Sequence, residues 1–376
     1  MAGASSTVVD DSSGDTDATG NYLEWVDARL LSVIAGSLVV LLAATVLQVS
    51  FGAYPLTLGE AWRTVFNPGL LFNLDLWRAF LLGAELPDWL TTRQHVVWNI
   101  RLPRVIVGVL VGANLALAGA IFQIVTRNEL ASPYILGVSD GAGLAVLLTL
   151  TMFSGMMGWL PLLAAAGGAF AFLLVYAIAW KNGTSPIRLV LAGVIVGSVF
   201  GSLQRALFFF IDDLGVAMAA QTWLSGSLLG TDWEQVRIAL PFTILTIVLA
   251  LAVTRQLNVL LLGEKTARSL GMSVERVRFA VAGIAILSTA AAIAVAGLVG
   301  FVGLIVPHMV RNLVGGDTKR LLVGCLFVGP ALLVGADVGA RLALNPVQLP
   351  VGIITGLVGG PYFLYLMRKQ ENMGEI

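Results

Sequence analysis

Residues 262–278 read Leu262-Gly263-Glu264-Lys265-Thr266-Ala267-Arg268-Ser269-Leu270-Gly271-Met272-Ser273-Val274-Glu275-Arg276-Val277-Arg278, a charged island between long apolar segments. Gly263 and Gly271 fit stops on either side of a short helix, and Ser273 fits the cap of a second one. The pattern predicts two short helices at a membrane surface. They are either a docking element for another protein or a loop that carries cytoplasmic positive charge.

Composition sets the class of protein. The chain has 376 residues, of which 57% are hydrophobic and 12% are charged, about half the charged share of a soluble domain. Apolar runs of about 20 residues recur along the chain, the length that a membrane-spanning helix needs. The short alternating segments of a membrane barrel are absent from the sequence. We therefore predict an all-α polytopic membrane protein, and the net charge of zero argues against a nucleic-acid partner.

The chemistry-bearing residues are few. The single cysteine, Cys325, and the two histidines, His95 and His308, are too scattered for a metal site. The sequence has no G-x-x-x-x-G-K-[ST] phosphate loop, so we predict no ATPase activity and no enzyme. Asp337 is the main carboxylate within a span, and Arg341 one turn later is its expected partner. An ion-coupled carrier and a membrane-embedded enzyme stay open as alternatives, disfavoured by the missing carboxylate relay and the missing side-chain cluster.

The chain divides into a polar tail and one membrane domain. Residues 1–27 are predicted to be a disordered tail, and residues 28–370 a single transmembrane domain with a long external connection at 51–100 and cytoplasmic helices at 258–278. About ten transmembrane helices are expected, at residues 28–49, 103–125, 134–153, 159–180, 187–210, 237–257, 278–297, 299–314, 320–340 and 350–367. A short external helix is expected within 211–236. The distribution of Lys and Arg places both termini in the cytoplasm of a multi-pass protein of the cell membrane.

Glycines at four-residue spacing mark helix faces that allow close approach. Gly108 and Gly112 form such a pair on the second span. Two longer stripes lie on the fifth and tenth spans: Gly193, Gly197 and Gly201, and Gly352, Gly356 and Gly360.

Five stretches in the second half and centre of the chain form a specific set. They are Arg101-Leu102-Pro103-Arg104, Arg127-Asn128-Glu129-Leu130-Ala131-Ser132-Pro133, Leu262 through Gly271, Gly300 through His308, and Asp337 and Arg341 with Leu349-Pro350-Val351-Gly352. In order and spacing they resemble the FecCD family, the ten-span permeases of ABC importers for iron-siderophores, haem and vitamin B12. Glu129 departs from the family pattern, where Pro is usual, and Gln348 stands where Glu is usual.

The resemblance implies a permease subunit that works as a homodimer in the lipid membrane. Two ABC ATPase subunits would bind ATP and Mg, and an external substrate-binding protein would deliver the cargo, with no cofactor or metal on this chain. The pathway would lie on the dimer axis, lined by the fifth and tenth helices and their glycine stripes. We expect vitamin B12 (cobalamin) as the cargo, with an iron-siderophore or haem as the alternative.

The resemblance also implies roles for individual residues. ATPase coupling is expected at Gly263, Glu264, Ala267, Arg268, Leu270 and Gly271. The cytoplasmic gate is expected at Asn128, Leu130, Ala131, Thr184 and Ser185. Docking of the binding protein is expected at Arg101, Arg104 and Arg341, with one alternative: Arg101 and Arg104 only extend to the membrane interface, and Arg341 only pairs with Asp337.

Overall fold

The protein is helical throughout the part that the computed structural model describes, residues 25–374 apart from 53, 182 and 345–346. An isolated bridge between Leu344 and Val347 is the only strand-like pairing among these residues. This outcome confirms the predicted fold class, because a chain in lipid must satisfy its backbone hydrogen bonds internally. The predicted tail lies almost wholly outside the described residues.

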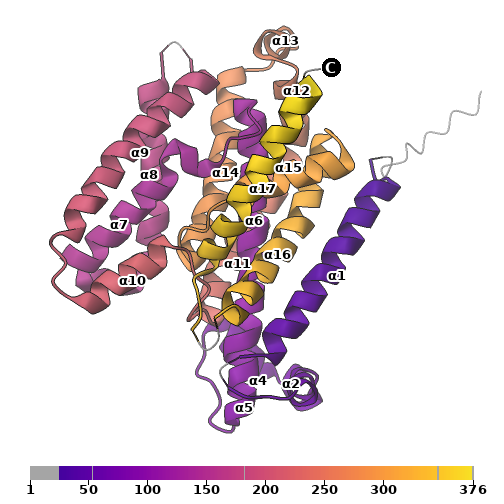
Figure 1. The fold of residues 1–376 in the computed structure, drawn as a ribbon, viewed down its shortest axis with the longest axis vertical. Coiled ribbons are helices and arrows are strands. Elements are labelled where there is room, and N and C mark those ends of the chain that lie inside the picture. The colour runs from indigo at the N-terminus through magenta and orange to yellow at the C-terminus, as the bar shows by residue number, and fades with distance from the viewer. Residues whose placement is uncertain (1–24, 53, 182, 345–346, 375–376) are drawn as a thin grey trace, which may run out of the picture.

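Ten helices correspond to the ten predicted spans (Figure 1): α1 (Ala28–Ser50), α6 (Leu102–Thr126), α7 (Val138–Met152), α8 (Leu160–Ala179), α9 (Pro186–Phe208), α11 (Trp233–Ala252), α14 (Val274–Ala296), α15 (Val302–Val314), α16 (Thr318–Leu342) and α17 (Val351–Gly374). Within the described residues, seven helical stretches are long and apolar enough to cross a membrane, and α7, α15 and the apolar part of α17 are shorter. The predicted short helix in the 211–236 segment is α10 (Leu214–Leu224).

The second span begins earlier than the sequence predicted. Pro103 lies in the first turn of α6, but α5 (Thr92–His95) and the π-helical segment η1 (Val96–Arg101) lead directly into it. The resulting helix is 35 residues long. The wide turn of η1, in which the amide of Leu102 donates to the carbonyl of Val97, allows the helix to continue up to Pro103.

Helix α6 is the centre of the bundle. In the most apolar part of each helical stretch, 89% of the residues are buried in the stretch that contains α6. The corresponding share is 78% for α14, 67% for α16 and 11% for α1. Glycines let its neighbours approach closely: Gly112 lies against the backbone of Gly329 in α16, and Gly119 against Gly303 in α15. The predicted close-packing face at Gly108 and Gly112 is confirmed, because a side-chain carbon at Gly108 would also lie only 3.0 Å from Val334.

A second lobe consists of α7, α8 and α9, with α10 lying across one end (Figure 1). Gly141 of α7 and Gly167 of α8 bring these two helices together, because a side-chain carbon at either position would overlap the backbone of the other. The short 3-10 helices η2 (Pro133–Leu136) and η3 (Ser154–Trp159) precede α7 and α8.

Residues 51–100 fold into a cap at one end of the bundle, which we call the α2 end. The cap contains α2 (Leu58–Val65), α3 (Pro68–Leu71), α4 (Leu74–Leu82) and α5. Phe80 stacks on Trp98 and Trp233, with ring centroids 5.8 and 4.6 Å apart, and the Trp98 indole donates to the carbonyl of Thr64. Trp77 packs edge-on against Trp98 and Trp233. Trp98 is buried in this aromatic core, whereas Trp89 stays exposed.

Capping boxes begin α2 and α5. Thr57 and Glu60 bond reciprocally at the start of α2, and Thr91 and Gln94 do so at the start of α5. Arg93 Nη2 lies 2.9 Å from Glu60 Oε1 and links the two helices. The amide and hydroxyl of Thr57, followed by the charge of Arg93, hold the pKa of Glu60 below its ordinary value.

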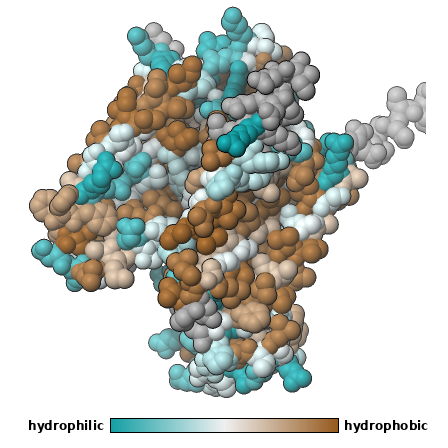
Figure 2. Space-filling model, viewed as in Figure 1, coloured by the Kyte–Doolittle hydropathy of each residue, from teal (hydrophilic) through white to brown (hydrophobic). Residues whose placement is uncertain are grey.

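The opposite end of the bundle, the α13 end, carries α12 (Thr254–Leu261) and α13 (Glu264–Ser269). The start of α1 and the end of α17 lie toward this end (Figure 1). Hydrophilic residues gather at the two ends of the molecule, and hydrophobic residues cover much of the surface between them (Figure 2). This distribution fits a protein that crosses a membrane.

We expect Gly112→Ala to destabilise the fold. The added carbon would lie 2.7 Å from the carbonyl carbon of Gly329, and overpacking of this kind costs about 1–3 kcal/mol. Thermal unfolding of the purified protein would measure the loss. Gly283→Ala in α14 is the matched control, because nothing lies within 4 Å of its added carbon. Equal midpoints for the two variants would contradict a close α6–α16 crossing.

Candidate functional site

The charged island folds as a short helix between two glycine turns. Gly263 (φ 113°) precedes α13, and Gly271 (φ 79°) follows it, so both predicted stops are confirmed. These φ values favour glycine because a side chain would clash with the backbone. The second predicted short helix is wrong, because residues 274–278 are the first turn of the 23-residue α14. The second short helix of this region is α12 instead.

Helix α13 has a buried face and an exposed face. Ala267 is fully buried between Leu260 and Val274, and it is the contact that seats α13 on α12 and α14. Leu262 and Leu270 are 62% and 63% exposed. The exposed charged side chains beside these leucines are Lys265, Arg268 and Arg276. We call α12, α13 and the first turn of α14, residues 254–278, the α13 unit.

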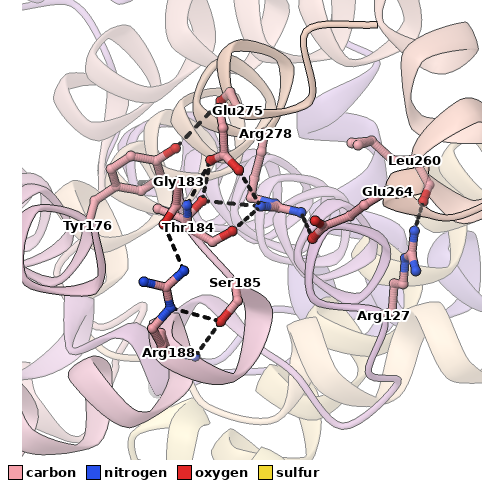
Figure 3. A network of polar contacts seen from close by, with 10 residues as sticks. All are labelled: Arg127, Tyr176, Gly183, Thr184, Ser185, Arg188, Leu260, Glu264, Glu275 and Arg278. Atoms are coloured by element: carbon pink, nitrogen blue, oxygen red, sulfur yellow. Dashed lines mark hydrogen bonds and ion pairs between the residues drawn. The ribbon is translucent and has the colours of Figure 1, made fainter. Parts of the chain in front are cut away.

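Arg278 joins the α13 unit to the bundle (Figure 3). Its guanidinium group is 2% exposed and donates to Glu264 Oε1 at 2.6 Å and to the carbonyl of Thr184 at 2.6 Å. The same group lies 3.3 Å from Glu275 Oε1, one turn earlier on α14. One buried cation therefore ties α13 and α14 to the turn between α8 and α9, here called the 181–185 turn. Charged hydrogen bonds of this kind are among the strongest that proteins form.

Glu275 holds the 181–185 turn from the other side. Its Oε2 accepts from the amide of Thr184 at 2.9 Å and from the Thr184 hydroxyl at 2.7 Å. Gly183 (φ 113°) comes so close that a side-chain carbon would lie 2.9 Å from Glu275 Oε1. Arg188 closes the turn by donating to the carbonyl of Gly183 at 2.8 Å and to Ser185 Oγ at 3.2 Å. The turn is thus fixed to the first residues of α14.

The turn after α6, residues 127–133, is the third segment at this end. Arg127 Nη2 donates to the carbonyl of Leu260 in α12 at 2.6 Å. Asn128 shapes the turn by accepting from the amides of Leu130 and Ala131. Glu129 reaches α15, where it lies 3.2 Å from His308 Nδ1 and 3.1 Å from Arg311 Nη1. The departure from Pro to Glu at this position therefore supplies a contact between the turn and α15.

The opposite end of the bundle buries three arginines around one carboxylate. Arg104 forms a bidentate pair with Asp337, with Nε and Nη2 each 2.8 Å from a carboxylate oxygen. Arg101 donates to the carbonyls of Val49, Ser50 and Tyr54 at 2.6–3.0 Å. The predicted pairing of Asp337 with Arg341 is corrected. Arg104 is the ion-pair partner of Asp337, and the Gln48 side-chain amide also donates to this carboxylate. Arg341 Nη1 donates to the carbonyl of Gln48 at 2.9 Å.

The three arginines with a predicted docking role are buried within the protomer. Arg101, Arg104 and Arg341 are 2%, 6% and 8% exposed, and their docking role stays a prediction. The last turn of α1 supplies the carbonyls that a helix end leaves without partners. The chain between α1 and α2 then passes over them, since a side-chain carbon at Gly52 would lie 3.1 Å from Arg101 Nη2.

Three of the six glycine-stripe residues pack closely within the protomer. Gly193 lies against Ile135 and Leu136 of η2, Gly197 against the Asp140 carboxylate, and Gly352 against the Ser225 carbonyl. Gly359, rather than the predicted Gly360, approaches the ring of Phe301. Gly360 has open space around it, Gly201 and Gly356 have neighbours only at van der Waals distance, and the predicted pathway role of the stripes stays a prediction.

Comparison with known proteins identifies the family. The model of the FecCD transport family matches residues 39–369. This chain belongs to the FecCD transport family. It is 43% identical to the cobalamin import system permease protein BtuC of Halobacterium salinarum over 74% of this chain and 75% of that protein. It is 40% identical to the Fe(3+)-citrate import system permease protein YfmD of Bacillus subtilis over 74% of this chain and 83% of that protein.

A solved structure supports the same placement. A metal-chelate type ABC transporter in an inward-facing conformation superposes with a TM-score of 0.76 at 28% identity, covering 90% of this chain and 99% of that one. The chain is therefore an integral membrane protein, the permease subunit of an ABC importer of the metal-chelate type. That role is consistent with the prediction that it is not an enzyme.

The sequence predicted the coupling and gate segments of this FecCD permease but not the contact that joins them. Thr184 and Ser185 were predicted as gate residues, and Glu264 as a coupling residue; Arg278 brings Thr184 and Glu264 together. Arg278 itself lies in the quoted island, but its main partner is 94 residues away in the chain. The sequence signal for this contact is an arginine near the start of α14, on the side of the helix that faces the bundle. This signal does not identify the residue that the arginine contacts.

We expect Arg278→Ala to loosen the α13 unit without unfolding this FecCD permease. The change leaves the carbonyl of Thr184 and the Glu264 carboxylate without the donor that Arg278 supplies. This loss should lower the free energy of local opening by about 1–3 kcal/mol. Hydrogen–deuterium exchange should then accelerate in residues 181–185 and 263–271. Arg276→Ala is the control, because Arg276 is exposed. Unchanged exchange in the Arg278 variant would show that the pair does not hold the unit.

We expect Arg104→Gln to cost about 3–5 kcal/mol of stability, because it leaves the Asp337 carboxylate buried without its cation. The double variant Arg104→Gln with Asp337→Asn should recover most of that loss in thermal unfolding. If Arg104 were a docking residue alone, the single variant would keep its unfolding midpoint and lose only affinity for the binding protein.

Proposed function

We propose that this permease imports cobalamin as a homodimer, with two ATPase subunits docked on the α13 units and a substrate-binding protein at the α2 end. The observation that carries the proposal is the two-sided construction of the α13 unit. Its outer face is exposed and partly apolar, and its inner face is tied to the bundle by a buried cation. A segment built in this way can receive a partner and transmit the partner's movement to the helices.

The outer face suits a protein partner. Leu262 and Leu270 provide apolar contact area, and Lys265, Arg268 and Arg276 provide charge around it. Interfaces commonly combine buried apolar anchors with a charged rim, which steers association. The partner would hold ATP and Mg, and its docking would place the α13 end in the cytoplasm. The predicted gate turns at residues 127–133 and 181–185 would then border the cytoplasmic exit.

A pathway between two copies is supported by the apolar faces that the protomer leaves open. On α9, Leu191, Ile195 and Val199 are exposed beside Ser198 and Ser202. On α17, Ile353 and Leu357 are exposed. A weakly polar surface of this kind would let a large chelate pass without binding it tightly, so that the binding protein sets the selectivity.

Cobalamin is supported by the relative from Halobacterium salinarum, whose name states that cargo. The relative named for Fe(3+)-citrate is almost as similar. A ferric chelate is therefore the second candidate, and the two cargoes are distinguished by experiment.

We expect Leu270→Asp to release the ATPase subunit from the purified complex. A carboxylate buried in an apolar interface without a partner costs several kcal/mol. Leu82→Asp is the matched control: Leu82 is 79% exposed but lies in α4 at the opposite end. Co-purification of the ATPase with both variants, at full coupled activity, would disprove docking through this face.

The cargo is tested by titrating the cognate substrate-binding protein with cyanocobalamin and with ferric citrate. The same two compounds are then offered to the importer reconstituted in liposomes. We expect binding and ATP-dependent uptake of cyanocobalamin. Uptake of ferric citrate alone would replace cobalamin by a ferric chelate, while leaving the role of the α13 unit intact.

A further inference from the structure

An apolar cavity of about 840 Å³ lies among α1, α15, α16 and α17. Its size falls within the range of ligand pockets, roughly 300–1,000 Å³. Helices α15 and α16 pack on α1, and α17 packs on α15 and α16 (Figure 1). We call this cavity the α1 trough. All of the helices that line the trough cross the membrane or belong to the apolar bundle. A ligand would therefore enter the trough from the lipid.

The lining of the trough suits an apolar ligand rather than a polar one. Among the polar side chains that line it, Ser32 Oγ already donates to the carbonyl of Ala28 at 2.8 Å and Thr355 Oγ1 to the carbonyl of Gly352 at 3.1 Å. Val33, Ile305 and Val358 are typical of the remaining lining. A ligand that fills this space must be a hydrocarbon along most of its length.

Glycines create the space. Gly36 of α1 and Gly335 of α16 both line the trough, and a side-chain carbon added at either would meet nothing within 4 Å. Gly112 and Gly119 differ in this respect, because their missing side chains are replaced by a neighbouring backbone. The glycines of the trough therefore leave a volume that no part of the protomer occupies.

A cation stands where the trough reaches the α13 end. Arg29 lies in the first turn of α1, and Val33, Gly36 and Val40 follow it at helical spacing along the face that lines the trough. Arg29 is exposed, and it forms no salt bridge with any residue that the structure describes. The nearby Arg320, by contrast, is engaged by Asp27 at 2.9 Å. Tyr362 adds a phenol to the trough lining from α17.

We propose that the α1 trough binds an anionic phospholipid, with an acyl chain between α1 and α17 and the phosphate beside Arg29. The hydrocarbon lining matches the chain, and the exposed Arg29 in line with it matches the headgroup. Basic residues at a membrane surface attract anionic lipids by about 1 kcal/mol each. The bound chain would fill the space between α1, the least buried spanning helix, and the remainder of the bundle.

A second copy of this chain is the competing occupant, because α17 also carries exposed apolar residues outside the trough. A protein partner would cover the trough with side chains and would show no preference for anionic lipid. The experiment below therefore compares two headgroups and records intermolecular cross-links in the same samples. It does not depend on the cargo or on the ATPase.

The test uses the full-length protein in nanodiscs of phosphatidylglycerol and phosphatidylcholine in equal amounts. Two samples are prepared, and in each of them one of the two lipids carries a photoreactive group on its acyl chain. The labelled peptides are then identified by mass spectrometry. We expect phosphatidylglycerol to label α1 and α16 in the wild type. Gly36→Leu and Gly335→Leu should each lose this labelling, because the added side chain starts in open space and extends into the trough. Gly283→Leu, at an open position on α14, should keep it.

Arg29→Gln should reduce the preference for phosphatidylglycerol over phosphatidylcholine about fivefold while leaving the apolar trough in place. Either of two results would overturn the proposal. One is labelling of α1 and α16 that persists in both filled variants or is equal for the two headgroups in the wild type. The other is intermolecular cross-linking at the trough of the wild type in place of lipid labelling. Gly36→Leu and Gly335→Leu lie on different helices, so a folding failure in one leaves the other informative.

Discussion

Arg278 lies where three chain segments meet, and its burial decides how the α13 end is built. A guanidinium group out of water must be matched by acceptors, because the cost of burying an unpaired charge is several kcal/mol. Here the acceptors come from α13, from α14 and from the backbone of the 181–185 turn. Moving any one of these segments alone would break charged hydrogen bonds. The α13 unit and the turn between α8 and α9 should therefore move together, as the coupling of an ATPase to a distant gate requires.

The same principle governs the α2 end with a different result. Three arginines gather there around Asp337, and two of them use backbone carbonyls in place of carboxylates. The end of α1 provides these carbonyls, and the cap formed by residues 51–100 is anchored above them by its aromatic core. A binding protein that approaches this end would meet the cap first. The exposed cap residues Phe72 and Leu74 are thus more accessible to it than Arg104.

The sequence predicted those features that depend on local pattern. Ten apolar runs gave ten helices, and Gly263 and Gly271 marked the limits of α13. Features that depend on distant partners were missed: Arg278 bonds to Thr184, and Arg104 in place of Arg341 bonds to Asp337. The cap was also missed, because Trp and Pro in a connection fit an interfacial segment as well as a folded one. The four-residue spacing of the glycines predicted that other parts of the protein approach these helix faces closely. The spacing could not show whether the neighbour is the backbone of Gly329, a turn or another protomer.

If the contacts of Arg278 hold in the working importer, the α13 unit and the 181–185 turn move as one rigid body. Spin labels at Ser269 and Lys181, both exposed, would report the distance across Arg278 in the assembled importer with and without ATP. A second pair at Ser269 and Asp317 would report movement relative to the start of α16. We expect ATP to change the second distance and to leave the first unchanged. A first distance that changes with ATP while the second stays fixed would disprove the rigid-body movement.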